Sequence, residues 1–391
     1  MTGPTREGRL TASQEPGQGS RRQRRLFAAV VTPVAAVILA VLVGSLVIIA
    51  ANIVATGTVD LVLPLKAYGS LLAGSLGSVN ALVNTVVSAA PLVLGGLAVG
   101  VGFKAGLFNI GVTGQFLLGA VAAAAMGAAL STAPAYVAIP LSIAAGAAAG
   151  CLWAFIPGLL KALTGAHEVV TTIMLNYIAA SVLGFLVIGP LAAPGYSFAR
   201  TGDIGSAALP ILFGRNLHAG VLIALAVVPL ISWLLYRSTI GFEIRTVGSN
   251  PSASRYAGMR PGALIVLTMS LCGILAGLAG TLEILGISHF VTTGYGTSVG
   301  FDSITVALLG RANPLGILIA ALLFGALRAG AGLMQIQAHI PVEIVDVIQA
   351  LILLFLAAEI LIRRLLRIRG ERAGVEELTT VTQSYGEGRV G

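Results

Sequence analysis

The sequence alternates long hydrophobic runs with short polar segments. Residues 26–51 contain no Asp, Glu, Lys or Arg, and neither do residues 105–160. A helix needs about 20 apolar residues to cross the hydrocarbon core of a bilayer, so the second run is long enough for two crossings. Because a segment in lipid must satisfy its own backbone hydrogen bonds, each crossing is predicted to be an α-helix. The chain is therefore expected to be an all-α, polytopic integral membrane protein.

The hydropathy pattern predicts ten membrane spans, at residues 27–50, 82–102, 107–130, 136–160, 169–189, 217–236, 262–283, 299–310, 315–334 and 342–362. The eighth is too short to cross alone and is expected to belong to a broken helix that includes part of residues 284–299. An even number of spans places both termini on one side, together with the polar segment 237–260. The segments 52–65, 189–216 and 335–341 then lie on the opposite side.

Composition and the placement of charge narrow the class of protein. Hydrophobic residues make up 57% and charged residues 10% of the chain, whereas a soluble domain carries roughly 25% charged residues. The net charge of +8 comes from basic residues clustered before the first span, after the last span and in the polar segment between the sixth and seventh. This positive-inside pattern predicts cytoplasmic termini and a plasma-membrane location. It argues against nucleic acid as a partner.

The expected domain organisation has three parts. Residues 1–25 are Gly-, Ser-, Gln- and Arg-rich and are predicted to form a disordered basic cytoplasmic tail. Residues 26–362 form the transmembrane domain, which includes a cytoplasmic loop at 237–261. Residues 363–391 form a cytoplasmic C-terminal tail.

Glycine is abundant and regularly spaced. Glycine occupies 50 of the 391 positions, against an average of roughly 7%. Many glycines lie four residues apart, a spacing that lets helix backbones approach closely in lipid: Gly96 and Gly100, Gly146 and Gly150, Gly273 and Gly277. Lys104-Ala105 and Arg311-Ala312 each precede a span that ends in Gly-Ala, a faint internal repeat. Two pseudo-repeated halves are typical of transporters with a site near the midplane.

The polar segment RSTIGFEIRTVGSNPSASRYAGMR, residues 237–260, stands between two nearly uncharged spans. It contains four arginines and one glutamate, and a Ser-Asn-Pro turn signal at 249–251 precedes a short helix-forming stretch. A segment of this size is large enough for a docking surface and too small for a domain. An ordinary solvated loop is the alternative interpretation.

Uncharged polar residues mark a first candidate site. Asn109, Thr113 and Gln115 lie among glycines near the start of a long apolar span, and Asn176 lies within the fifth span. Polar groups in a span either hold helices together or line a wet path. These four residues are the candidates for a translocation path, and helix–helix bonding is the alternative.

Ionisable residues mark a second candidate site. Glu283, His289 and Asp302 lie in a stretch interrupted by glycines, and ionisable groups at membrane depth are functional candidates by default. The span count places this stretch near the outer face, where an external loop residue needs no special role. An intramembrane serine hydrolase that uses Ser298 and His289 is a minor alternative, because no base or oxyanion hole follows from their positions.

Several kinds of chemistry have no support in the sequence. The chain lacks the G-x-x-x-x-G-K-[ST] motif of a phosphate-binding loop, so it is not expected to hydrolyse ATP itself. No His, Cys or carboxylate spacing indicates a metal site. Cys151 and Cys272 lie in apolar spans and are interpreted as packing residues. The chain is expected to be neither an enzyme nor a cofactor carrier.

Three motifs in order along the chain resemble those of bacterial ABC importer permeases of the branched-chain amino-acid/ribose type, and within them the nucleoside and simple-sugar permeases. They are GLFNIGVTGQFLLGA at 106–120, EIRTVGSNPSASRYAGM at 243–259 and GFDSITVALLGRANPLGILIAALLFG at 300–325. The resemblance covers roughly residues 80–360. It implies a type II-like permease fold with pseudo-repeated halves.

The resemblance also implies roles for the polar segment between the sixth and seventh spans. That segment is similar to a coupling helix seated in a groove of the ATPase. By position, Gly248, Asn250 and Pro251 would form its turn, and residues 253–258, ending at Gly258, would form the short helix. The residues that would contact the ATPase are Arg245 and Arg255.

Together, the residues and the resemblance predict the permease subunit of an ATP-driven importer of nucleosides. The implied partners are ABC ATPase subunits that bind the ATP, a second and shorter permease chain, and a substrate-binding lipoprotein. A permease for a simple sugar such as ribose is the alternative. An ion-coupled secondary transporter is less favoured, because it would need coupling carboxylates at the midplane.

Overall fold

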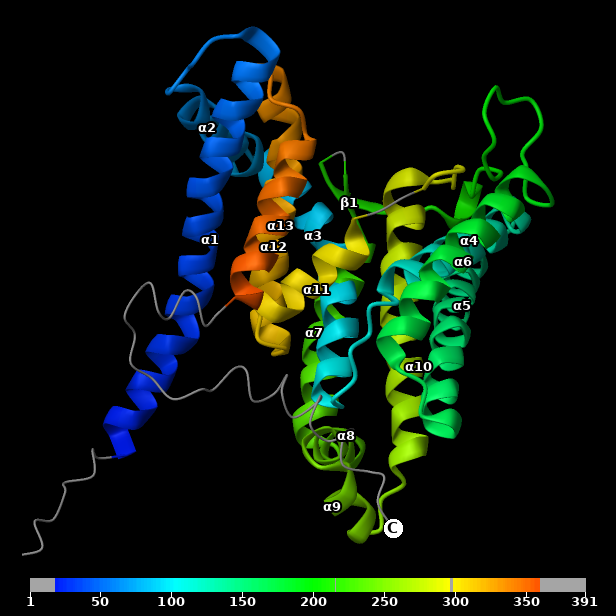
Figure 1. Ribbon diagram of the computed structural model, residues 1–391. Helices are drawn as coiled ribbons and strands as arrows, with labels where there is room; N and C mark the ends of the chain where they lie inside the picture. Colours follow the sequence, from blue (N-terminus) through cyan, green and yellow to red (C-terminus); the bar gives the residue numbers. More distant parts are fainter. Residues whose placement is uncertain (1–17, 215, 296–297, 359–391) are drawn as a thin grey trace, which may run out of the picture.

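The computed structural model describes residues 18–214, 216–295 and 298–358. The fold is almost entirely helical (Figure 1). The N-terminal half consists of α1 (Gln18–Thr56), α2 (Leu63–Leu76), α3 (Val79–Lys104), α4 (Val112–Ala129), α5 (Ala135–Thr164) and α6 (Glu168–Ile188). A short 3-10 turn (Gly205–Ala207) and the hairpin β1 (Ile211–Phe213) and β2 (Leu217–His218) follow. The C-terminal half consists of α7 (Gly220–Arg237), α8 (Thr239–Ser249), α9 (Pro251–Tyr256), α10 (Pro261–Glu283), α11 (Val299–Leu309), α12 (Pro314–Ala338) and α13 (Glu343–Ala357).

Among the described residues, eight helices are long and apolar enough to cross a membrane: α1, α3, α4, α5, α6, α7, α10 and α12. The predicted eighth and tenth spans correspond to the shorter helices α11 and α13. The expectation of an all-helical, polytopic membrane protein is therefore confirmed. Residues 359–362 of the tenth span, the tail 363–391 and residues 1–17 lie outside the described residues.

Three boundaries differ from the sequence-based expectation. Helix α1 begins at Gln18, so residues 18–25, predicted to be disordered, are helical. Helix α2 was not predicted, because it is short and carries Lys66 and a proline at its start. Residues 284–288 continue α10 as one π-helical turn instead of beginning α11.

The interior is built around α3, which is buried along most of its length between Thr85 and Gly102. Helices α5 and α10 pack closely at the predicted glycine pairs. A Cβ added at Gly277 would come 2.5 Å from the carbonyl oxygen of Gly146, and one at Gly150 would come 2.7 Å from the Cα of Gly277. These positions require glycine because backbone meets backbone there.

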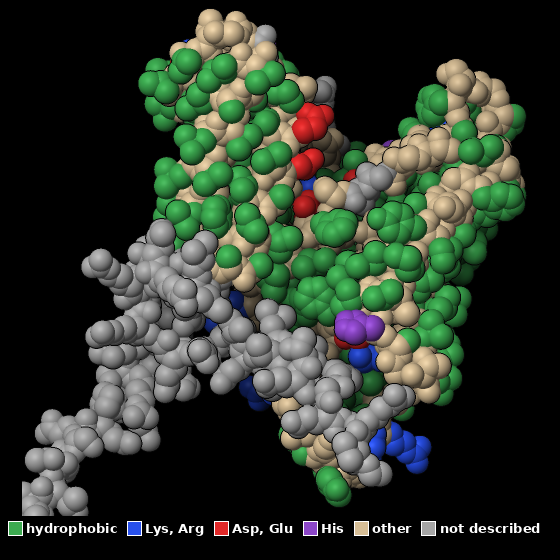
Figure 2. All heavy atoms as spheres, in the orientation of Figure 1, with side chains coloured by type: hydrophobic (Ala, Val, Ile, Leu, Met, Phe, Trp, Pro, Cys, Tyr) green, Lys and Arg blue, Asp and Glu red, His purple; other side chains and the backbone are tan. Residues whose placement is uncertain are grey.

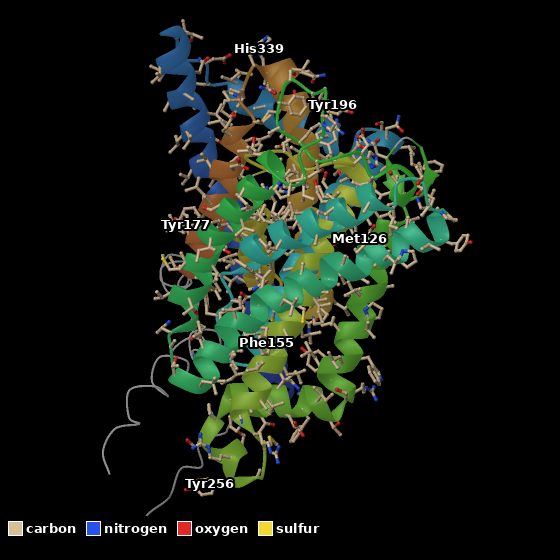
Figure 3. The ribbon with its side chains drawn as sticks, turned by 90° about the vertical axis from the view of Figure 1, so that its right-hand side faces the viewer. Met126, Phe155, Tyr177, Tyr196, Tyr256 and His339 are labelled. Carbon is tan, nitrogen blue, oxygen red and sulfur yellow. The ribbon has the colours of Figure 1, made fainter. Side chains whose placement is uncertain are left out.

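The helices form two arms joined at the centre (Figure 1). One arm holds α1, α2, α12 and α13, the other holds α4, α5, α6 and α10, and α3, α7 and α11 lie between them. The hairpin and the loops after α1, α6 and α12 lie at one end, and α8 and α9 lie at the other. Figure 3 shows Tyr196 and His339 at the first end and Tyr256 at the second. The predicted separation of the polar segments into two opposite sides agrees with this arrangement.

Candidate functional site

The polar segment 237–260 folds into two short, capped helices. Ser238 caps α8, where its hydroxyl accepts a hydrogen bond of 3.0 Å from the Gly241 amide. Asn250 caps α9, where its side-chain oxygen accepts one of 2.9 Å from the Ala253 amide. Such caps stabilise a helix end by about 1 kcal/mol. The segment is therefore a stiff element that protrudes from the end of the molecule (Figure 1).

The predicted turn and short helix are shifted by two to three residues in the structure. Gly248 belongs to α8, and Pro251 is the first residue of α9, which ends at Tyr256. Gly258 follows with a φ of 82°, while the Met259 amide donates to the Ser254 carbonyl at 3.1 Å. This is the glycine-dependent way of ending a helix. Asn250, Pro251 and Gly258 thus determine the shape of the segment.

Gly248 connects this segment to the rest of the molecule. A Cβ at Gly248 would come 2.7 Å from the carbonyl carbon of Ala105 and 2.8 Å from the amide nitrogen of Gly106. Gly106 has a φ of 69°, a left-handed conformation that favours glycine. The end of α8 therefore presses on the turn that leads from α3 into α4.

The two predicted ATPase-contacting arginines differ in exposure. Arg245 is half-buried, with its Nε donating to the Gly241 carbonyl at 3.3 Å and its guanidinium 5.4 Å from the centre of the Tyr236 ring. Arg255 is exposed. Its neighbour Tyr256 is 95% exposed and points away from the bundle in Figure 3. The sequence analysis did not single out Tyr256, because no sequence pattern shows that a side chain at the end of a short helix is almost fully exposed.

The turn between α3 and α4 is held by a pair of buried amides. The Asn109 side-chain NH₂ donates to Gln115 Oε1, and the Gln115 NH₂ donates to Asn109 Oδ1, both at 3.1 Å. Asn109 Oδ1 also accepts from the Gly111 amide at 3.0 Å. Asn109 is 0% and Gln115 1% exposed. Of the two interpretations of these amides, this geometry favours the bonding of one segment to another.

Helix α6 fastens the same turn from outside. Asn176 accepts from the Gly114 amide at 2.8 Å and donates to the Ile110 carbonyl at 2.9 Å. Thr113, the fourth path candidate, is half-buried and lies against α11, where a Cβ at Gly300 would come 2.8 Å from its amide nitrogen. The four path candidates are therefore brought together around one turn, although Asn176 lies on a different helix from the other three.

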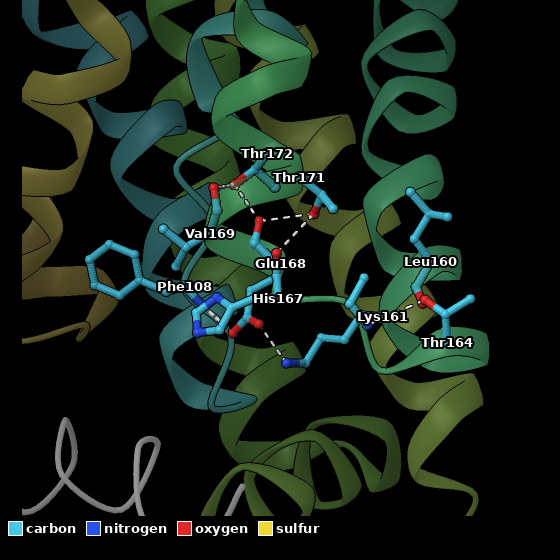
Figure 4. A network of polar contacts seen from close by, with 10 residues as sticks. Phe108, Leu160, Lys161, Thr164, His167, Glu168, Val169, Thr171 and Thr172 are labelled. Carbon is cyan, nitrogen blue, oxygen red and sulfur yellow. Dashed lines mark hydrogen bonds and ion pairs between the residues drawn. The ribbon is translucent and has the colours of Figure 1, made fainter.

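A buried ion pair lies beside the turn and was not predicted. Lys161 Nζ, near the end of α5, lies 2.5 Å from Glu168 Oε2, at the start of α6, with side chains 6% and 4% exposed (Figure 4). The other carboxylate oxygen of Glu168 accepts from the Phe108 amide at 3.5 Å. Both charged residues lie at the ends of membrane spans. A prediction from sequence treats charges at such positions as exposed to water, so it does not reveal that this pair is buried.

The three ionisable residues of the second candidate site, Glu283, His289 and Asp302, occupy two separate places in the fold. Asp302 Oδ2 accepts from Arg328 of α12 at 2.6 Å, and the Ser298 hydroxyl accepts from the same guanidinium. Arg328 also interacts electrostatically with Glu283. His289 is separate from this group: it is exposed and ends the π-helical turn with a φ of 61°. Since Ser298 is bonded to Arg328, the Ser298–His289 hydrolase hypothesis gains no support.

Figure 2 shows that the molecular surface is hollowed between the two arms, and that acidic side chains and a basic one gather along one wall of the hollow. Arg328 was missed in the sequence, although it is an arginine inside an otherwise apolar span. Its partners lie on α10 and α11, so only the fold shows that they meet.

One histidine of the hairpin end is tightly enclosed. His218 is 1% exposed, and a Cβ at Gly286 would overlap its ring, lying 2.6 Å from Cγ and closer still to Nδ1 and Cε1. Burial lowers the pKa of His218, and the nearby His289 lowers it further. His218 is therefore neutral near pH 7, as a buried imidazole with a lowered pKa must be.

Comparisons with known proteins identify relatives along most of the chain. Residues 81–357 match the family described as "Branched-chain amino acid transport system / permease component". The chain is 39% identical over 338 residues to the guanosine ABC transporter permease protein NupP of Bacillus subtilis, covering 85% of this chain and 94% of that one. A second permease described by the same words in that organism, NupQ, is 27% identical over 253 residues, covering 62% and 78%.

Two further relatives are named for glucose and for nucleosides. The glucose ABC transporter permease protein TsgB13 of Haloferax volcanii is 35% identical over 337 residues, covering 83% of this chain and 86% of that one. The nucleoside ABC transporter permease protein NupB of Lactococcus lactis subsp. cremoris is 36% identical over 319 residues, covering 78% and 86%. No solved structure gives a significant match.

Proposed function

The chain belongs to the family of permease components of branched-chain amino acid transport systems, and from this premise we propose that it carries nucleosides into the cell. It is a multi-pass membrane protein and the permease subunit of an ABC importer. The observation that carries the nucleoside assignment is the 39% identity to a guanosine permease over 85% of the chain. The 36% identity to a second nucleoside permease supports it.

The α8–α9 segment is the proposed contact with the ATPase. Arg255 and Tyr256 offer an exposed charge and an exposed aromatic ring at its tip. Arg245 and Asn250 support them from within the segment. When the ATPase modules close on ATP, the tip moves, and Gly248 transmits that movement to the turn at Gly106. Capped helices transmit force better than a flexible loop would.

The turn between α3 and α4 then becomes the moving part of the path. Asn109 and Gln115 hold its shape, and Thr113 and Asn176, which are half-buried, lie where a neutral solute passes. Uncharged polar groups suit a neutral nucleoside, because they offer hydrogen bonds without the desolvation cost of a charge.

The end of the molecule that carries α8 and α9 is proposed to face the cytoplasm, since ATP is found there. Lys104, Lys161 and the four arginines of residues 237–260 lie at this end, in accordance with the positive-inside rule. Both chain termini are proposed to lie on the same side. The hairpin end then faces the substrate-binding lipoprotein.

A second, different permease chain is proposed to complete the path. The support is that two permeases of one organism, NupP and NupQ, are both described as guanosine ABC transporter permeases, and both are similar to this chain. A homodimer would need only one such chain. Two ABC ATPase modules complete the transporter.

A simple-sugar permease is the second candidate function. It is favoured by the 35% identity to a glucose permease. Guanosine and glucose each contain a sugar ring with adjacent hydroxyl groups, so the same kind of polar path can serve both.

Uptake measurements in cells that lack this gene test the assignment. Restoring the wild-type gene is expected to restore uptake of labelled guanosine and adenosine, with excess ribose or glucose failing to compete. If the sugars compete fully, or if nucleoside uptake does not depend on the gene, the nucleoside assignment is wrong. An empty vector and a membrane-abundance blot are the controls.

A further inference from the structure

We propose that Asp302, Arg328 and Ser298 form a binding site for the vicinal hydroxyl groups of ribose, placed in the hollow between the two arms. The inference rests on the proposed nucleoside import and names the part of the substrate that this place recognises. The ligand class is a neutral ribonucleoside, held by its 2′- and 3′-hydroxyls.

The depth of the charges is the first step. Arg328 lies ten residues before Ala338, the last residue of α12, which corresponds to about 15 Å along the helix axis. Since the hydrocarbon core is about 30 Å thick, the guanidinium lies near the middle of the span. A charge at that depth is costly unless it is paired or faces a water-filled cavity, and it marks a substrate pathway by default.

Access from the hollow is the second step. Ser298 is exposed, and the side chain of Arg328 is 25% exposed. The Asp302 side chain is 9% exposed. A pair that only joined α11 to α12 would be fully buried, whereas part of each partner is accessible here. Figure 2 shows acidic side chains and a basic one along one wall of the hollow.

The balance of charge is the third step. Two further carboxylates act on the ion pair: Glu283 interacts electrostatically with Arg328, and Asp346 with Asp302. Each carboxylate can accept up to about four hydrogen bonds, so the three together accept more than the roughly five that one arginine can donate. The excess of acceptors fits a ligand that donates hydrogen bonds, and it repels an anion such as a nucleotide phosphate.

A buried amide on α13 is a further polar group without a partner. Gln349 is 2% exposed, and neither its Nε2 nor its Oε1 has a hydrogen-bond partner among the described residues. At about 100° per residue, its side chain lies about 60° around the helix from that of Asp346. A donor and an acceptor therefore remain unused about one turn from a carboxylate that acts on Asp302.

A metal ion is a poorer occupant than a diol. Within the described part of the chain, no group of three His, Cys, Asp or Glu side chains comes close enough to hold one. A vicinal diol, in contrast, can donate to a carboxylate and accept from a guanidinium at the same time. Asp302 and Arg328 offer this combination in one place.

The test compares substrates with and without the diol. Cells carrying the full transporter are assayed for uptake of guanosine, 2′-deoxyguanosine and 2′,3′-dideoxyguanosine. Wild type is expected to prefer guanosine. Asp302→Asn is expected to lower guanosine uptake about tenfold and to leave the dideoxy analogue nearly unchanged, which removes the preference. Ser298→Ala, which keeps the ion pair, is expected to reduce the preference about threefold.

The controls separate recognition from folding. Glu343→Gln removes one exposed carboxylate from the start of α13 and is expected to leave the guanosine preference unchanged. Membrane abundance is measured for every variant, and Ser298→Ala covers the case in which Asp302→Asn does not accumulate.

The outcomes distinguish this site from the import function. If uptake of all three compounds is independent of the gene, the proposed function fails and this inference fails with it. If uptake depends on the gene but the variants reduce all three compounds equally, or none, nucleoside import stands and the diol site is wrong.

Discussion

Gly248 of α8 and Gly106 of the α3–α4 turn meet backbone to backbone. A Cβ on Gly248 would lie 2.8 Å from the Gly106 nitrogen, and one on Gly106 would lie 3.1 Å from the Gly248 carbonyl oxygen. No side chain intervenes between the protruding segment and the turn that carries the polar network. The contact is therefore rigid, and under the proposed coupling role a displacement of α8 is expected to reach residues 106–115 without being absorbed by rotamer changes.

Substitution of Gly248 tests this contact. Gly248→Ala is expected to lower uptake about tenfold and to destabilise the protein by about 1–3 kcal/mol, because the added carbon overlaps backbone that cannot rotate away. Uptake and thermal unfolding in detergent measure the two effects. Gly262→Ala is the matched control, since a Cβ there meets only Ala162, at 3.7 Å. Normal uptake in Gly248→Ala would show that the contact transmits nothing.

The tip of α9 is tested by charge and by shape. Arg255→Glu and Tyr256→Ala are each expected to reduce co-purification of the ATPase and uptake at least about tenfold, while thermal stability stays within about 0.5 kcal/mol because both side chains are exposed. Lys66→Glu makes the same charge change as Arg255→Glu at an exposed position of α2. Equal loss of uptake in Lys66→Glu and Arg255→Glu would argue against docking at α9.

The Lys161–Glu168 pair is expected to show strong non-additivity. Removing one partner leaves an uncompensated buried charge, so Glu168→Gln or Lys161→Met should destabilise the protein by about 3–5 kcal/mol. The double variant should cost less than the sum of the two, because no unpaired charge remains. Thermal unfolding in detergent gives the three values. Simple additivity would mean that the two charges do not interact in the membrane.

Asn176 is expected to be needed for the turn. Asn176→Ala removes the bonds to Gly114 and Ile110, leaving two buried backbone groups unpaired at a cost of about 1–3 kcal/mol. Hydrogen exchange of residues 108–115 should rise, and uptake should fall. Ser181→Ala, on the same helix, removes only an exposed bond to the Tyr177 carbonyl and serves as the control. Unchanged hydrogen exchange of residues 108–115 in Asn176→Ala would show that Asn176 does not stabilise the turn.

Stability is expected to fall on acidification because of His218. Its pKa is lowered in the folded state, so the unfolded chain binds more protons at mildly acidic pH and stability rises with pH. The loss begins as pH falls through about 6.5, the ordinary value for histidine, and grows until the folded-state pKa is reached. Thermal unfolding from pH 8 to 5 measures it. His218→Gln should flatten this dependence, whereas His167→Gln should keep it.

The sequence predicted most of what depends on local pattern. The long apolar runs correspond to the helices, the predicted glycines Gly146, Gly150 and Gly277 lie at a helix–helix contact, and the nearby amides Asn109 and Gln115 bond to each other. These features follow from spacing along one segment or from the cost of polar groups in lipid, both of which can be seen in a linear chain.

The remaining features depend on pairing between distant segments. Glu168 looks like an ordinary acidic residue at a helix start until the fold brings Lys161 to it. Arg328 is paired with Asp302, which lies on a different helix, so the ion pair could not be predicted from either segment alone. Helix α2 was not predicted because it is too short to cross the membrane, and in the fold it packs against α12 and α3. The hydrophobic pattern along the chain does not show which distant segments will contact each other.

The backbone-to-backbone contact at Gly248 has a consequence for how such transporters can diversify. Arg255 and Tyr256, the side chains proposed to contact the ATPase, lie on α9. The contact with Gly106 is made by Gly248 of α8. If α9 were exchanged for that of another permease, the chain would be expected to bind a different ATPase and to keep the Gly248–Gly106 contact unchanged. On the proposed function, recognition of the ATPase and transmission to the path therefore belong to different parts of one chain, which meet at a rigid contact of main-chain atoms.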